Sequence, residues 1–213
     1  MENFDLHSII SSGELIRTKF DKTEWISNVT YNISDNYIQV ELTQDYINKL
    51  IMVGDSVKCK VSTAQNEYVL DGIVDKIEIE DLKIMTIKVI NINKFENTRQ
   101  NSRYDAYIIS KITVNREPAI FSVVTSLSTS GISVASKSEL QSDSEAFVEV
   151  FVDSGNTIRF YGKVVRKAIN ENGYEYGIKF KQLDEQNEHI LVNVLSELKS
   201  KEESLLKKFF EQK

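Results

Sequence analysis

The sequence predicts a mainly β protein built from two small antiparallel β-barrels and one C-terminal α-helix. From residue 24 onward, short segments rich in Val, Ile and Tyr alternate apolar with polar residues and are separated by Asp, Asn, Ser and Gly. This pattern is typical of antiparallel strands. From residue 183 onward, apolar residues instead recur three and four apart, which indicates an amphipathic helix. The 213 residues suffice for two small domains.

The first predicted domain covers residues 1–95. Its first 20 residues lack strong periodicity, so their structure stays open. The strand-like segments that follow are WISNVTYNIS, YIQVEL, DSVKCKVS, EYVLDGIVDKIEIE and LKIMTIKVININ. A helical stripe of one or two turns lies between the second and third of them, formed by Tyr46, Ile47, Leu50 and Ile51. This domain is expected to be a small barrel or sandwich.

The second predicted domain covers residues 96–213. Its strand-like segments are YDAYIISKITV, AIFSVVTSLSTSGISVAS, EAFVEVFVDS, TIRFYGKVVRKAIN and YEYGIKFK. Turn-forming residues at 153–156 and 170–173 predict hairpins there. The only proline, Pro118, precedes the second strand, where it can begin an extended segment without breaking a ladder.

The chain ends in a predicted helix that Asp184 can cap. One face carries Ile190, Leu191, Val194, Leu195 and Leu198, and a second stripe of Leu205, Leu206, Phe209 and Phe210 follows the polar residues 201–203. The first half is expected to pack across the barrel mouth. The last turns either do the same or meet a partner or a second copy of the chain, because the Phe pair would otherwise be exposed.

Composition narrows the function classes. The formal net charge is −6, with 10 Lys+Arg against 15 Asp+Glu up to residue 95 and 16 against 17 after it. Neither half is a basic platform, so we expect no binding of DNA or RNA. No apolar run approaches the ~20 residues that span a bilayer, and the N-terminus lacks the features of a signal peptide. A cytoplasmic protein that does not span a membrane is therefore expected.

The chemistry of common enzymes is missing from the sequence. The two histidines, His7 and His189, lie in different regions, and the one cysteine, Cys59, lies in a strand-like stretch. This leaves no His/Cys cluster spaced for zinc. The eight glycines are scattered and form no P-loop, GxGxxG or GxSxG motif. We expect no catalytic activity and no cofactor, and an enzyme of an undetected type is the least favoured alternative.

Two arginines, Arg99 and Arg103, lie four apart in the polar segment KFENTRQNSR between the predicted domains. In a turn or an extended segment, two guanidinium groups at this spacing can converge on one ligand and bind phosphate oxygens or the Hoogsteen edge of guanine. Taken alone, the pair is more often two solvated arginines at the start of a strand.

A second polar group lies in the strand that begins after Pro118. Strand alternation points Ser126 and Ser128 to the same face. Gly131 lets the backbone bend or lets a ligand approach closely. Taken alone, this group is a polar turn.

The order of these motifs resembles the PilZ family of cyclic di-GMP receptors, from residue 97 to about 195. The resemblance rests on RxxxR, then about twenty residues later a strand ending in LSxxGI, then GKVVR and YEYGIKF. It implies that Arg99 and Arg103 grip the guanine bases and phosphates of cyclic di-GMP. It also implies that Ser128 and Gly131, from the (D/N)xSxxG motif, form the opposite wall.

The resemblance also has implications for two further residues, Ser126 and Arg166. The first motif position departs from the family pattern, because it is Ser126 instead of Asp or Asn. A carboxylate can accept hydrogen bonds from the guanine N1–H and amino group together, whereas a hydroxyl accepts from one donor at a time. This loss corresponds to ~1.5–3 kcal/mol, or about one to two decades of affinity. Arg166, in GKVVR, is implied to lie against the ligand, where its guanidinium can stack on a guanine.

The first domain then resembles the split-barrel-like N-terminal domain of flagellar brake proteins of the YcgR type. Such proteins carry RxxxR on the connection between their domains, and LIMVGDSVKCKV is similar to an entry segment of that domain. The implied function is a cyclic di-GMP effector that changes its interdomain arrangement and regulates a protein partner, with flagellar motor components as the candidate. The alternative is an interaction module whose nucleotide site has decayed, with Ser126 as the first sign and the C-terminal helix as the working surface.

Overall fold

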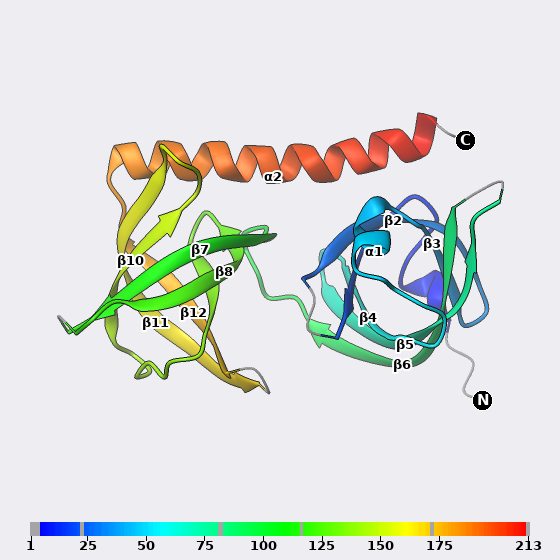
Figure 1. The fold of residues 1–213 in the computed structure, drawn as a ribbon, viewed down its shortest axis with the longest axis horizontal. Helices are drawn as coiled ribbons and strands as arrows, with labels where there is room; N and C mark the ends of the chain where they lie inside the picture. Colours follow the sequence, from blue (N-terminus) through cyan, green and yellow to red (C-terminus); the bar gives the residue numbers. More distant parts are fainter. Residues whose placement is uncertain (1–4, 22–23, 81–82, 116, 171–172, 212–213) are drawn as a thin grey trace. The chain divides into compact units, whose positions relative to one another are not determined.

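The computed structural model describes residues 5–21, 24–80, 83–115, 117–170 and 173–211. In these residues the chain forms two closed antiparallel barrels and a C-terminal helix (Figure 1). The predicted fold class is therefore confirmed. The chain divides into two compact units, one made of residues 1–98 and 201–213 and the other of residues 99–200. The domain ranges 1–95 and 96–213 stay a prediction.

The barrel of the first unit has the strand order β1-β2-β3-β6-β5-β4, with β4 pairing back to β1. Its strands are β1 (Leu15–Phe20), β2 (Ile26–Ser34), β3 (Tyr37–Glu41), β4 (Ser56–Ser62), β5 (Asn66–Glu78) and β6 (Ile84–Glu96). A short 3-10 helix, η1 (Leu6–Ser8), precedes β1, and α1 (Gln44–Asn48) links β3 to β4. Strand β1 falls in the stretch that the sequence left open.

The barrel of the second unit repeats this order as β7-β8-β9-β12-β11-β10, with β10 pairing back to β7. Its strands are β7 (Tyr104–Val114), β8 (Ile120–Ser128), β9 (Gly131–Ser136), β10 (Glu145–Phe151), β11 (Thr157–Asn170) and β12 (Gly173–Gln182). Both units therefore share one topology of antiparallel neighbours. Pro118 precedes β8, as predicted.

The two predicted hairpin turns join β10 to β11 and β11 to β12. In the first, Asp153 Oδ1 accepts hydrogen bonds from the backbone N–H groups of Gly155 (2.7 Å) and Asn156 (2.9 Å), and these bonds close a tight turn. In the second, Gly173 has φ +129°, a value that favours glycine. Residues 171–172 of this turn lie outside the described residues.

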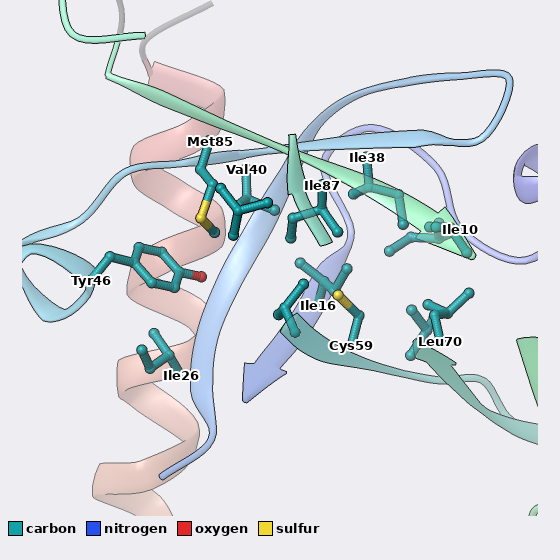
Figure 2. Close-up of a cluster of buried hydrophobic side chains, with 14 of the residues drawn as sticks. Ile10, Ile16, Ile26, Ile38, Val40, Tyr46, Cys59, Leu70, Met85 and Ile87 are labelled. Carbon is teal, nitrogen blue, oxygen red and sulfur yellow. The ribbon is translucent and has the colours of Figure 1, made fainter. Parts of the chain in front are cut away.

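The first barrel encloses a polar group in its apolar core. Figure 2 shows the Tyr46 side chain of α1 reaching into this core, which includes Ile16, Cys59 and Met85. The Tyr46 hydroxyl hydrogen-bonds with Thr18 Oγ1 at 2.8 Å and accepts from Asn28 Nδ2 at 3.2 Å. Burial raises the pKa of Tyr46 above its ordinary value. The side chain of Tyr46 thus anchors a helix that is too short to be stable alone.

The helical stripe around Tyr46 is only partly confirmed. Tyr46 and Ile51 are buried, but Ile47 is exposed and Leu50 is 77% exposed. The reason is that α1 ends at Asn48 and Leu50 adopts φ +53°, outside the helix. The predicted periodicity therefore continues past the point where the backbone is helical.

The C-terminal helix, α2 (Glu185–Glu211), runs without a break through residues 201–203. Asp184 Oδ1 accepts a hydrogen bond from the backbone N–H of Asn187 at 2.8 Å, which confirms the predicted cap. This bond lowers the pKa of the Asp184 carboxyl. Leu191, Val194 and Leu195 belong to the core of the second unit. The first half of the stripe is therefore a packing face.

The last turns of α2 belong to the first unit. Glu202 forms an ion pair with Arg17 at 2.5 Å, and the ring of Phe209 meets the ring of Tyr31 edge-on, with 6.1 Å between centroids. Phe210 is 66% exposed. One of the two aromatic residues is thus packed within the chain and the other faces solvent.

Replacing Tyr46 with Phe is expected to lower the free energy of unfolding of the first unit by about 1–2 kcal/mol, because Thr18 and Asn28 lose a buried partner. Urea unfolding followed by the fluorescence of Trp25, the only tryptophan, reports on this unit. The control Tyr37→Phe removes a hydroxyl from a half-buried position and is expected to change the value by less than about 0.5 kcal/mol. Equal midpoints for the two variants would contradict the stabilising role of the Tyr46 hydroxyl.

Cys59 is expected to be chemically inert in the folded protein. Its side chain is fully buried, and desolvation raises the pKa of the thiol to about 12, so both the thiolate and access to it are lacking at pH 8. An aromatic disulfide reagent should label it fully in urea and not at all in buffer within minutes. Rapid labelling in buffer would show that the first barrel opens readily.

Candidate functional site

A hollow of about 150 Å³ lies on the second unit where β9, β11 and β12 run next to one another. The β8–β9 turn contributes Ser128, Ser130 and Gly131 to its lining. Arg103 lines it from the segment just before β7, and Lys179 from β12. No Asp or Glu in the described part of the chain lines it. Two cations and two hydroxyls in one concave site favour a small anionic ligand.

This hollow brings together three of the six predicted site residues. Arg103, Ser128 and Gly131 line it, although Arg103 and Gly131 are 28 positions apart in the chain (131 − 103). Arg99, Ser126 and Arg166 are not among its lining residues. Arg99 is exposed in the segment before β7, and Ser126 lies two residues before Ser128 on β8. The predicted set as a whole stays a prediction.

The β8–β9 turn is closed by its own hydroxyl group. Ser128 is 3% exposed, and its Oγ donates a hydrogen bond to the carbonyl oxygen of Gly131 at 2.9 Å. Ser128 therefore holds the turn in shape as well as lining the hollow.

Gly131 is required by the packing of two strands. A Cβ atom at this position would overlap the carbonyl oxygen of Ile178 on β12 and come within 3.1 Å of Lys179 Cα. The sequence left open whether this glycine serves a backbone bend or a ligand. The close approach of β9 to β12 is sufficient reason for it.

A β-bulge shapes the far side of the hollow. Strand pairing runs from Val164↔Ile178 to Arg166↔Gly177, so Val165 is an extra residue on β11. Val165 is exposed and lines the hollow. Arg166 lies across from Gly177 and forms an ion pair with Glu175. In this state its guanidinium is bound to a carboxylate on the neighbouring strand.

The sequence interpretation missed six lining residues, which are Ser130, Ile132, Ile178, Val165, Gly177 and Lys179. A signal existed for the last two, because they alternate on one face of the YEYGIKF strand. Val165 could not be found from alternation, since the bulge changes the side-chain period at that point.

The described residues were also compared with the requirements of a metal site and of a membrane-spanning helix. No group of three or more His, Cys, Asp or Glu among them could hold a metal ion. No helix among them is long and apolar enough to cross a membrane.

Comparison of the sequence with known protein families finds a match to one of them. The sequence profile of the PilZ domain matches residues 97–197. No curated protein matches the chain.

Comparison with solved structures finds several similar chains. The inhibitor of motility MotI/DgrA of Bacillus subtilis is 14% identical, with 87% of this chain and 95% of that one covered and a TM-score of 0.42. YcgR of Escherichia coli, in complex with c-di-GMP, is 12% identical, with 95% and 91% covered and a TM-score of 0.49. MrkH of K. pneumonia, also in a c-di-GMP complex, is 11% identical, with 89% of each chain covered and a TM-score of 0.47. Because these identities are low, the candidate site residues of this chain are assigned from its sequence motifs and not from these structures.

Replacing Gly131 with Ala is expected to lower the free energy of unfolding of the second unit by about 1–3 kcal/mol, because the new methyl group overlaps backbone atoms of β12. Urea unfolding followed by far-UV circular dichroism measures the change. The control Gly155→Ala adds a methyl group in an exposed turn, where the nearest atom is 3.7 Å away, and is expected to be nearly neutral. Equal stability of the two variants would mean that β9 and β12 can separate without cost.

Proposed function

The chain carries a PilZ domain at residues 97–197, and from this premise we propose that the protein is a cytoplasmic cyclic di-GMP effector without catalytic activity of its own. The observation that carries the proposal is the hollow on the second unit, where Arg103 from the RxxxR motif meets Ser128 and Gly131 from the serine–glycine motif. The two motif halves are separate in sequence and adjacent in space.

The chemistry of the hollow suits this ligand. Arg103 and Lys179 supply positive charge for phosphate oxygens, and an arginine fork can bind phosphate or the Hoogsteen edge of guanine bidentately. Arg99, exposed four residues earlier, would add a second fork once the segment closes on the ligand. Ser126 would contribute a single hydroxyl. Arg166 would stack on a base after leaving Glu175.

Regulation would follow from ligand binding next to the connection between the two units. Arg99 and Arg103 lie where residue 98 ends the first unit and residue 99 begins the second. A nucleotide that orders this connection would change the arrangement of the two barrels, to the extent that it binds one arrangement more tightly. The altered surface would regulate a protein partner, with flagellar motor components as the candidate by family analogy. DNA and RNA are not expected partners.

A degenerate PilZ module is the second candidate, and two observations favour it. Ser126 replaces the motif's Asp or Asn, and the Ser128 hydroxyl already donates to Gly131 within its own turn. Such a module would bind its protein partner equally with and without nucleotide. A pull-down carried out in both conditions separates the two candidates.

Titration calorimetry with cyclic di-GMP tests the leading proposal. Arg99→Ala and Arg103→Ala are each expected to weaken binding by about 10- to 100-fold, because each removes a charge-assisted contact. The control Arg159→Ala removes an arginine of β11 that pairs with Glu149 and does not line the hollow, so it should bind like wild type. No heat from the wild-type protein at tens of micromolar would refute the proposal.

A further inference from the structure

Strand pairing in the second barrel places five residues in one line across four strand boundaries. Asp105 on β7 is opposite Ser126 on β8, and Ser126 is opposite Ser133 on β9. Ser133 is in turn opposite Gly177 on β12, and Gly177 is opposite Arg166 on β11. Residues that are directly opposite in antiparallel strands project to the same face, with Cβ atoms about 4.5–5.5 Å apart. We call these five residues the transverse row.

The transverse row faces the outside of the barrel. The chain neighbours of its members on β8, β9 and β12, including Leu127, Ile132 and Tyr176, belong to the buried core. Since side chains alternate along a strand, the row points away from that core.

The transverse row also borders the hollow. Gly177 lines the hollow directly, and the next line of opposed residues, Ser128, Gly131 and Lys179, lines it as well. Gly177 is the one member of the row among the lining residues, so a ligand seated in the hollow would meet the row there.

The chemistry of the row changes along its length. A carboxylate at Asp105 stands at one end and a guanidinium at Arg166 at the other, with two hydroxyls and a glycine between them. Guanine presents two adjacent donors on one edge, the N1–H and the 2-amino group, and a carboxylate can accept from both at once. Asp105 is half-buried, which strengthens such a contact relative to one made in open water.

We propose that Asp105 supplies the carboxylate that recognises the guanine N1–H and 2-amino group, the role that Ser126 cannot fill. This inference rests on the proposed function. The acid stands on the neighbouring strand, directly opposite the motif position where the family pattern has Asp or Asn. One cross-strand step separates the two positions, so a carboxylate at either one reaches the same ligand edge.

The same geometry explains why Ser126 is not acidic. An Asp at position 126 would put two carboxylates directly opposite each other on adjacent strands, where like charges repel and destabilise the pair. The uncharged hydroxyl of Ser126 avoids this repulsion. In the transverse row, Ser126 is therefore the partner that an acid at position 105 requires.

Calorimetric titration with cyclic di-GMP tests the role of Asp105, using variants that remove its carboxylate or move it to position 126. Asp105→Asn is expected to weaken binding by about 10- to 100-fold. The double variant Asp105→Asn/Ser126→Asp, which returns the acid to β8, should restore affinity to within several-fold of wild type. Ser126→Asp alone should not tighten binding. The control Asp143→Asn removes an exposed acid paired with Lys163 and should bind like wild type.

A second measurement needs no substitution. Cyclic di-IMP lacks the 2-amino group, so the wild-type protein should bind it at least about tenfold more weakly than cyclic di-GMP, as expected when a half-buried acceptor loses one of its donors. Equal affinity for the two nucleotides would overturn the assignment even if the Asp105 variants failed to fold.

The outcomes separate this inference from the proposed function. If Asp105→Asn binds like wild type while Arg103→Ala abolishes binding, the protein is a cyclic di-GMP receptor in which Asp105 plays no such part. If neither the wild type nor any variant binds, the proposed function falls and the inference falls with it.

Discussion

Strand register in the second barrel is the constraint on which its outer surface depends. Side chains alternate with a period of two, so a slip of one residue between β9 and β12 would turn Ser133 and Gly177 toward the core and expose apolar residues. Gly131 protects this register, because β12 passes so close that no side chain fits there. A glycine of the proposed ligand motif thus serves the pairing of β9 with β12.

Irregular strand pairing then changes which side chains lie on the outer surface of the second barrel. Register shifts occur between Asp105 and Ile108 on β7, between Val124 and Ser126 on β8, and between Val164 and Arg166 on β11. All three lie next to members of the transverse row, and bulges commonly redirect side chains near functional sites. The first barrel has the same strand order, yet its main polar group, around Tyr46, points inward and stabilises the core. One topology therefore supports a polar group in the interior of one unit and a hollow with polar lining on the outside of the other.

The charge of the residues that line the hollow differs from the net charge of the whole chain. The whole sequence carries a formal charge of −6, but the hollow gathers Arg103 and Lys179 without an acidic lining residue in the described part of the chain. Exposed charges farther apart than about 8–10 Å are largely screened at physiological salt. The cationic lining of the hollow therefore differs in sign from the net charge of the chain.

The sequence predicted the fold class, most strands, the Asp184 cap and the turn at Asp153, because each depends on residues close together in the chain. It also predicted Arg103, Ser128 and Gly131 as candidate site residues, and these three line one hollow. It could not find strand β1, the early end of α1 or the extra residue Val165, since local periodicity does not reveal where pairing begins, ends or slips. Only the tertiary structure brought Asp105 opposite Ser126, which are 21 positions apart in the chain (126 − 105). That contact depends on the register of two paired strands, and no spacing along one strand encodes it.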